Sequence, residues 1–321
     1  MRAYERLLNY VKVWTTSDEE STTSPTTARQ FDLAKLLLEE MKGMGIEDAM
    51  MDEYGYVYGH IPATPGYENC TAIGFLAHMD TAPDYSGENV NPQIIENYDG
   101  KDVVLGTSGR TLTVKDFPSL KNMTGKTLIT TDGTTLLGAD DKAGIAEIMT
   151  VAEELLKGDI PHGSVCLAFT TDEEVGSGAC HMDLERFGAP YAYTVDGGPE
   201  GEIQFENFNA ASGHVTIQGK GIHPGSAKGK MKNALLIAME FQALLPAFEN
   251  PMYTEGYEGF YHLDHMEGDV EGAQMAYIIR DHDREKFEQK KAFFEKAAEF
   301  LNAKYGAGTV TAVVKDSYYN M

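Results

Sequence analysis

Four segments of this 321-residue chain each end in a histidine or a carboxylate, and this pattern strongly limits the possible folds. The endings are AHMDT at 77–81, GADDKAG at 138–144, TTDEEVG at 170–176 and TVDGG at 194–198. In an open α/β sheet, such endings converge on one crevice at the carboxyl ends of the strands. One imidazole and several carboxylates in that crevice predict a divalent metal site, so we expect a metallohydrolase.

His78 and Asp80 flank Met79, so both side chains project to the same face of an extended chain. This spacing suits a metal-binding imidazole with a carboxylate behind it that orients the ring and raises its basicity. The alternative is a hydrogen-bonded loop histidine, but the three other segments favour a ligand. Asp196, in VDGG, would complete the set, and its alternative is a turn aspartate before two glycines.

Two pairs of adjacent carboxylates need separate assignments. Of Asp140 and Asp141, which precede a helical pattern, one is expected to be an N-cap, and we assign that role to Asp141. Asp140 is then expected to bridge two zinc ions. Glu173 and Glu174 repel each other unless a cation offsets their charges, although acid pairs on solvated loops are common. One of this pair can bind metal while the other takes a proton from the attacking water.

Two basic side chains in the second half of the chain are candidates for substrate binding. His223, in HPG, is expected either to donate to a carbonyl oxygen that becomes an oxyanion or to be an ordinary surface residue. Arg280, which follows an apolar run, is expected either to bind a substrate carboxylate or to form an ordinary salt bridge. Six histidines without such context are treated as structural: His162, His181, His214, His262, His265 and His282.

Composition argues against several classes of function. A net charge of −24 argues against binding nucleic acid or an anionic membrane, because no basic surface offsets it. The three cysteines lack CxxC spacing and fit the reduced thiols of a cytosolic enzyme. The N-terminus lacks the apolar core of a signal peptide, and no window approaches the roughly 20 apolar residues of a membrane span. We therefore expect a soluble, cytoplasmic protein.

The spacing of apolar residues predicts an α/β protein whose first part is a mixed, largely parallel sheet with helices on both faces. Residues 84–126 are rich in Gly, Asp, Asn and Pro, and are expected to form a long excursion with little regular structure. The expected helices of this part are 4–13, 27–41 and 141–157, and the expected strands are 71–77, 127–131, 164–170 and 192–195.

From about residue 207 the pattern changes to a βαββαβ-like order, which is typical of a small α+β unit with one sheet and two helices. The expected strands of this part are 214–221, 253–263, 276–280 and 309–314, and the expected helices are 233–245 and 283–305.

Several long motifs are more specific than spacing alone. They are AHMDTAPD at 77–84, LLGADDKAGIAEIM at 136–149, TTDEEVGSGA at 170–179, YTVDGG at 193–198 and IHPGSAKGKMKNA at 222–234. Together they resemble the co-catalytic zinc peptidase family that also contains aminoacylases and glutamate carboxypeptidases. The segments SGENVNPQIIENYDG and MYTEGYEGFYHL extend the resemblance over nearly the whole chain and favour the tripeptidase branch.

This resemblance implies a role for each candidate in the first part of the chain. His78 and Asp196 would bind one zinc ion. Glu174 would bind the second, with Asp140 bridging the two ions, and Glu173 would be the general base.

The resemblance also implies roles around the zinc ions and a division into domains. Asp80 would support the ligand histidine, His223 would reach a substrate carbonyl, and Arg280 would bind a substrate carboxylate. The implied domains are a catalytic domain at 1–208, an inserted α+β lid at 209–317 that often mediates dimers, and the start of the return to the catalytic domain at 318–321.

One departure from the family concerns the end of the sequence. In the family, the chain returns from the lid to the catalytic domain and supplies a final histidine ligand for the second zinc ion. This sequence ends in DSYYNM, where that return would begin, so no residue after Asp196 matches the ligand. We expect either a fragment of a longer protein or, if the chain ends there, an enzyme that is weakly active at best.

The leading expectation is a zinc-dependent aminopeptidase that releases the N-terminal residue from tripeptides and forms a homodimer through its lid. One alternative is a truncated remnant that binds zinc or dimerises with little turnover. Another is a deacylase or carboxypeptidase of the same fold. The segments NVNPQIIENYDG and TEGYEGFYHL favour the tripeptidase over this last alternative.

Overall fold

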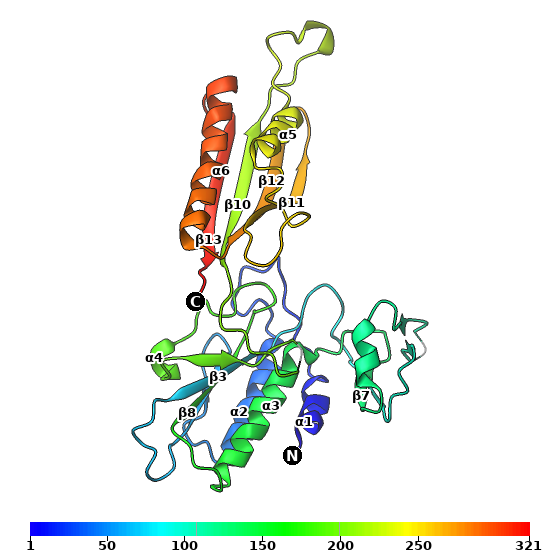
Figure 1. The fold of residues 1–321 in the computed structure, drawn as a ribbon, viewed down its shortest axis with the longest axis vertical. Coiled ribbons are helices and arrows are strands. Elements are labelled where there is room, and N and C mark those ends of the chain that lie inside the picture. Colours follow the sequence, from blue (N-terminus) through cyan, green and yellow to red (C-terminus); the bar gives the residue numbers. More distant parts are fainter. Residues whose placement is uncertain (107, 199) are drawn as a thin grey trace. The chain divides into compact units, whose positions relative to one another are not determined.

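The computed structural model describes residues 1–106, 108–198 and 200–321, and the chain divides into two compact units. Unit 1 comprises Met1–Glu200 and unit 2 comprises Gly201–Met321. Each unit has its own main sheet (Figure 1). Each also has its own apolar core. None of the helices in the described residues is long and apolar enough to cross a bilayer.

Five strands form the main sheet of unit 1: β1 (Met50–Met51), β2 (Val57–Ile61), β3 (Ile73–His78), β8 (Val165–Thr170) and β9 (Ala192–Thr194). Their order is β1-β2-β8-β3-β9. β8 and β9 run parallel to β3 on its two sides, whereas β2 runs antiparallel to both β8 and β1. β8 is buried along its whole length, which explains its continuous apolar sequence.

Helices cover both faces of this sheet: α1 (Ala3–Tyr10), α2 (Gln30–Met44), α3 (Ala139–Leu156) and α4 (Leu184–Phe187). On one face, the first three share an apolar cluster with alternate residues of β8 such as Leu167 and Phe169. On the other face, Phe187 of α4 packs against Cys166 and Ala168. The predicted mixed sheet with helices on both faces is therefore confirmed.

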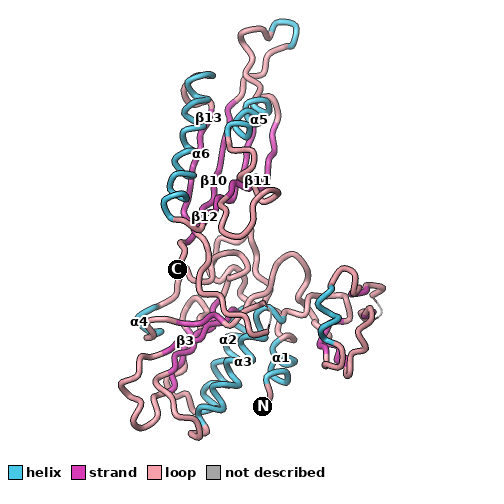
Figure 2. The backbone as a smooth tube through the Cα atoms, viewed as in Figure 1, coloured by secondary structure: helices cyan, strands magenta, loops and turns pink. Residues whose placement is uncertain are grey.

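The excursion between β3 and α3 contains more regular structure than the sequence predicted. Its elements are β4 (Pro92–Ile95), β5 (Val103–Val104), β6 (Thr111–Leu112), the 3-10 helix η1 (Pro118–Met123) and β7 (Leu128–Thr131). β4 pairs with β7 and β5 with β6, around a small core of Tyr98, Val103 and Leu105, and loops make up most of the rest (Figure 2). The strand expected at 127–131 is present as β7, but it belongs to this lobe and not to the main sheet.

Unit 2 has the predicted βαββαβ order, with a short 3-10 helix in addition: β10 (Asn209–Gln218), η2 (Pro224–Ser226), α5 (Ala234–Leu244), β11 (Phe260–Gly268), β12 (Gly272–Asp281), α6 (Arg284–Tyr305) and β13 (Val310–Tyr318). The strands form one antiparallel sheet in the order β11-β12-β10-β13. Phe241 of α5 and Phe294 of α6 share a core with Val215 and Ile279 of the sheet. One face of the sheet is therefore covered by both helices.

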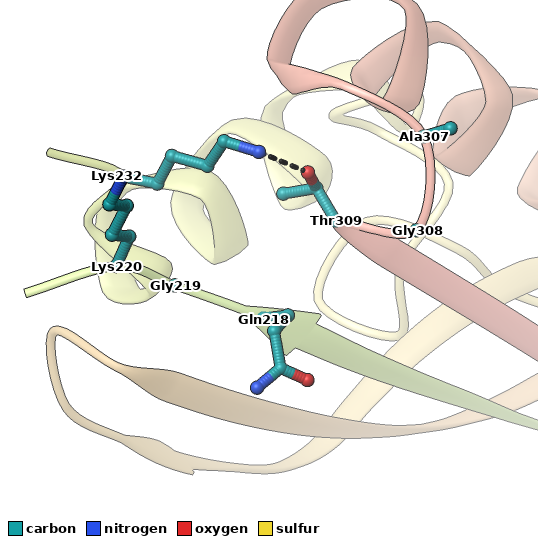
Figure 3. Close-up of a pocket in the computed structure, with 7 residues that line it drawn as sticks. All are labelled: Gln218, Gly219, Lys220, Lys232, Ala307, Gly308 and Thr309. Atoms are coloured by element: carbon teal, nitrogen blue, oxygen red, sulfur yellow. Dashed lines mark hydrogen bonds between the residues drawn. The ribbon is translucent and has the colours of Figure 1, made fainter. Parts of the chain in front are cut away.

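A hollow of about 260 Å³ lies in unit 2 where the loop after α6 passes the end of β10 (Figure 3). The Lys232 ammonium group extends across it and donates to the Thr309 hydroxyl at 3.0 Å. Because a cation beside the last turn of a helix is favoured by the helix dipole, we assign Lys232 a structural role at the end of α6.

A buried ion-pair network ties α1 to α2 and α3. The Arg6 side chain is 3% exposed and lies 2.7 Å from both the Glu40 and Glu153 carboxylates. We expect Arg6→Met to lower the free energy of unfolding by about 3 kcal/mol, because it leaves Glu40 without its cation and leaves Glu153 with only the N-terminal ammonium group. Urea unfolding followed by fluorescence of the single tryptophan, which lies in unit 1, measures this change.

The control for this prediction is Lys157→Met, which removes an exposed pair between Lys157 and Glu154 at the end of α3, in the same unit as the tryptophan. An exposed pair contributes only about 0.2–1 kcal/mol, so the free energy of unfolding should barely change. Equal losses in the two variants would mean that the buried network adds nothing beyond a surface pair.

Candidate metal centre

The carboxyl ends of three parallel strands carry predicted site residues to one edge of the unit 1 sheet. His78 is the last residue of β3, Glu173 and Glu174 follow β8, and Asp196 follows β9. Asp140 comes from the first turn of α3. The structure thus brings the other three predicted ligands, together with Glu173, around the imidazole of His78.

The His78 ring points one nitrogen into the cluster and the other away from it. Nε2 lies 3.0 Å from Asp140 Oδ1, and 3.8 Å from both Glu173 Oε2 and Asp196 Oδ2. Nδ1 lies 3.1 Å from the backbone carbonyl oxygen of Asp80 and 3.4 Å from its carboxylate. A proton that Asp80 holds on Nδ1 leaves the Nε2 lone pair for a cation, as a ligand histidine requires.

Asp80 also organises the glutamate pair. Its side chain is 0% exposed, and its Oδ1 accepts the Glu173 amide at 3.0 Å while Oδ2 accepts the Glu174 amide at 3.1 Å. One buried carboxylate therefore fixes both the imidazole on β3 and the turn after β8. The spacing H-x-D makes this arrangement possible, since residues two apart on an extended chain share a face.

Two groups of three side chains could each hold a cation, and His78 belongs to both. One group joins it to Asp140 and Glu174, and the other joins it to Asp141 and Asp196. Within each group, all ligand atoms lie within 4.8 Å of one another. Asp141 therefore belongs to the cluster, although sequence spacing pointed only to a cap.

Asp141 also makes the hydrogen bond of a cap. Its carboxylate accepts the Gly144 amide at 3.1 Å, three residues on, and the His78 amide at 3.3 Å. The backbone is not helical at Asp140 and Asp141, so the regular part of α3 begins after them. In the sequence, nothing in the pair of adjacent aspartates distinguishes a residue that caps from one that also faces the site.

Negative charge is concentrated in this cluster. Burial raises the pKa of the Asp141 carboxyl to about 8, and the charge of Asp196 adds to the effect. Burial and the neighbouring carboxylates raise the pKa of Glu174 to about 7. Burial alone would lower the pKa of His78, but its hydrogen bond with Asp80 and the surrounding carboxylates raise it to about 10. A divalent cation would offset this repulsion between carboxylates, so the charges fit a metal site.

Lys142 is a buried residue behind the cluster that sequence analysis did not single out. It is 1% exposed, and its ammonium group donates to the Val13 carbonyl oxygen at 2.8 Å. Burial lowers the pKa of Lys142 to about 7, although the charge of Asp80 opposes this effect. A lysine at the start of an apolar helical run was the signal that could have identified it.

A pocket of about 360 Å³ lies between the start of α3 and the end of β9. Asp140, Asp141, Asp196 and, further along the helix, Glu147 line it. Gly144 allows the helix to approach the strand end closely, since a Cβ there would lie 1.8 Å from the Val195 carbonyl oxygen. The pocket gives a small ligand access to three of the clustered carboxylates.

The two predicted substrate-binding residues lie in unit 2. His223 is exposed, caps η2, and accepts the Gly225 amide on Nδ1 at 3.2 Å. Arg280 stacks on aromatic rings, with its Cζ 4.2 Å from the Phe208 ring centroid and 6.0 Å from that of Phe260. Its Nε is buried without a hydrogen-bond partner in residues 1–106, 108–198 and 200–321. Stacking therefore orients the Arg280 side chain.

Sequence relatives match this chain over nearly its whole length. It is 54% identical over 320 residues to peptidase T of Alkaliphilus oremlandii and 56% identical over 319 residues to peptidase T of Geobacillus thermodenitrificans. These matches cover 99% of this chain, and 78% and 77% of the two relatives. The chain belongs to the peptidase T family. The resemblance seen in the sequence motifs is thereby confirmed.

Family models and solved structures show further similarity to peptidases. Residues 205–309 match the peptidase dimerisation domain, and residues 124–235 match the M42 glutamyl aminopeptidase model. The aminopeptidase PepT from Bacillus cereus is similar with a TM-score of 0.75 at 26% identity, over 100% of this chain and 76% of that one. A tripeptidase from Staphylococcus aureus shares the fold with a TM-score of 0.72 at 22% identity, over the same shares of each chain.

Proposed function

We propose that this chain is a metallo-aminopeptidase that releases the N-terminal residue from tripeptides. The observation that carries the proposal is the convergence of Asp140, Glu174 and Asp196 on the imidazole of His78. Membership of the peptidase T family and the likeness to a solved aminopeptidase support the reaction. The segments at 86–100 and 252–263, which resemble the tripeptidase branch, support the substrate class.

The donor set fits zinc, because one imidazole nitrogen and several carboxylate oxygens are ligands that zinc accepts. We propose that His78 and Asp196 hold one ion and Glu174 the other, with Asp140 between them. Asp140 suits the bridge better than Asp141, whose oxygens already accept two backbone amides. When bound, the ions would polarise the scissile carbonyl and make the attacking water more acidic.

Glu173 is proposed as the general base. It belongs to neither ligand group, and its side chain is 53% exposed at the crevice. Its backbone is fixed by Asp80 on one side, and on the other by the Gly176 amide, which donates to the Glu173 carbonyl oxygen at 2.7 Å. From this position the carboxylate would take a proton from the attacking water and pass it to the leaving amine.

The residues of unit 2 are proposed to bind the substrate. Because His223 Nδ1 accepts the Gly225 amide, the proton of the neutral ring lies on Nε2, which can donate to a developing oxyanion. The guanidinium of Arg280, which lies over the Phe208 ring, can bind the C-terminal carboxylate of a peptide through two parallel hydrogen bonds. Recognition of both a carbonyl and a terminal carboxylate would limit substrates to short peptides.

We propose the domain division that the sequence implied. Residues 1–208 form the catalytic domain, residues 209–317 form a lid, and residues 318–321 begin the return to the catalytic domain. The match to a peptidase dimerisation domain over 205–309 supports a homodimer formed through this lid. Free cysteines, with Cys166 buried and Cys70 and Cys180 exposed, support a cytoplasmic location.

The proposed function is tested by comparing a tripeptide that has a free amino group with its N-acetylated form. We expect the free tripeptide to be cleaved at least about tenfold faster, because acetylation removes the charge of the N-terminal ammonium group. A hydrogen bond to a charged group contributes roughly 1.5–3 kcal/mol. Release of the free N-terminal amino acid, followed by chromatography, is the measurement. A chelator should abolish the activity, and Zn²⁺ should restore it.

Two outcomes would contradict this function. Faster release from an N-acyl amino acid than from the free tripeptide would favour a deacylase of the same fold. Cleavage at the C-terminal residue of the tripeptide would favour a carboxypeptidase. Either outcome would leave the proposed metal centre unchanged but would assign a different substrate class to it.

A further inference from the structure

Asp172 is buried beside the proposed catalytic pair, yet the proposed chemistry does not use it. It is 1% exposed and directly precedes Glu173 and Glu174 in the turn after β8. Its φ is 59°, in the left-handed region that residues other than glycine rarely adopt. The turn that carries the glutamate pair therefore begins at a residue in an unusual conformation.

The Asp172 carboxylate accepts hydrogen bonds from a segment that is distant in sequence. The Thr26 amide lies 3.0 and 2.9 Å from its two oxygens, and the Thr26 hydroxyl donates to Oδ1 at 2.6 Å. Gln30 donates to Oδ1 through Nε2 at 2.6 Å and accepts the Asp172 amide on Oε1 at 3.2 Å. Because Gln30 is 0% exposed, water cannot easily replace these bonds when one partner is lost.

A second anchor holds the other side of the same turn. Asp80 accepts the amides of Glu173 and Glu174, and the Ser177 amide donates to the Asp172 carbonyl oxygen at 2.9 Å and closes the turn. Asp80 thus fixes the amides of the pair, while Asp172 fixes where the turn begins. The direction of both glutamate side chains depends on these two anchors.

We propose that Asp172 is a positioning residue, whose bonds to Thr26 and Gln30 hold the turn that presents Glu173 as base and Glu174 as ligand. This inference rests on the proposed function. Conformation alone does not call for aspartate, because glycine adopts positive φ more readily and asparagine tolerates it as well. The donors that face the carboxylate explain the aspartate and connect the start of α2 to the metal-binding edge.

The test uses Asp172→Gly, which removes the carboxylate but keeps the conformation accessible. We expect the Kd for Zn²⁺ to rise and kcat to fall, each by about 10–100-fold, as for other residues that orient metal ligands. KM should change by less than about threefold, because Asp172 does not touch the substrate. Calorimetric titration with Zn²⁺ against a competing chelator gives the Kd, and this value does not depend on the fraction of inactive protein.

Two further variants separate positioning from a general loss of structure. Asp172→Asn keeps one acceptor oxygen and tolerates positive φ, so it should recover most of the Zn²⁺ affinity. Asp183→Gly is the matched control, because Asp183 also accepts a backbone amide, that of Arg186 at 2.9 Å, but at the exposed start of α4. It should bind Zn²⁺ as the unmodified chain does.

Hydrogen exchange in the metal-free protein gives a readout that needs neither metal nor activity. The amides of residues 173–178 should exchange faster in Asp172→Gly than in the unmodified chain, because the turn opens more readily. Unchanged exchange together with an unchanged Zn²⁺ affinity would overturn the inference. If Asp172→Gly does not fold, the same two measurements on Thr26→Val, which removes only the hydroxyl bond, decide the question.

If the proposed function is wrong, the result differs from the one that overturns the role of Asp172. In that case the unmodified chain would bind Zn²⁺ without cleaving any tripeptide. Amide exchange and Zn²⁺ affinity would still report whether Asp172 holds the turn.

Discussion

Glu173→Gln is expected to lower kcat for tripeptide hydrolysis by about 10²–10⁴-fold while bound zinc stays nearly unchanged. Glutamine keeps the shape of glutamate but cannot take a proton from the attacking water. The zinc should remain because Glu173 lies in neither candidate ligand group. The turn should also persist, because Asp80 binds the backbone amide of Glu173 and not its side chain. Steady-state kinetics and elemental analysis of the same preparation measure both quantities.

Glu147→Gln is the matched control for this prediction. Glu147 is an exposed carboxylate on α3 that lines the same pocket as the clustered aspartates, so the change removes one negative charge from the same region. Because a solvated charge outside the reaction contributes little, kcat should stay within a factor of about three. Zinc loss in proportion to activity loss in Glu173→Gln would instead make Glu173 a ligand.

The clustering of the candidate site residues could be predicted from the sequence because each strand end is a local feature. The strands expected at 71–77, 164–170 and 192–195 are present as β3, β8 and β9, with carboxyl ends within one residue of the prediction. In each, an apolar run stops at or shortly before a polar residue. Because parallel strands place their carboxyl ends at one edge, three local signals were enough to assemble the cluster.

The remaining features depend on contacts between residues that are distant in sequence. Nothing in the sequence pairs Thr26 with Asp172, or Lys142 with the Val13 carbonyl oxygen. The strands β1 and β2 were not predicted, since MDEYGYVYGHI mixes glycine and polar residues with tyrosines that are buried only in the folded sheet. β11 begins at Phe260 and not at 253, because the preceding residues form hydrogen-bonded turns.

The roles of individual carboxylates came from the resemblance and not from spacing. Spacing alone could not decide which of Glu173 and Glu174 binds metal. The division stays a prediction, and the observation that favours it is that Glu174, but not Glu173, lies in a candidate ligand group. Group membership does not separate the roles of Asp140 and Asp141 in the same way, because each of them belongs to one candidate ligand group with His78.

His223→Asn is expected to lower kcat by about 10²–10³-fold with bound zinc unchanged. The Gly225 amide donates to Nδ1 at 3.2 Å, so the proton of the neutral ring is on Nε2. That N–H is the proposed donor to the oxyanion that develops on the substrate carbonyl, and asparagine is too short to replace it. The zinc ligands should not change, because His223 lies in unit 2 and the ligands lie in unit 1.

Comparison of two substitutions separates this donor from the fold of its loop. Asparagine can still accept the Gly225 amide and cap η2, whereas alanine cannot, so equal losses in His223→Asn and His223→Ala would assign the effect to the donor. His265→Ala removes another exposed imidazole from unit 2 and should leave kcat unchanged. A loss in His223→Ala, with normal kcat in His223→Asn, would mean that His223 only caps the loop and takes no part in the chemistry.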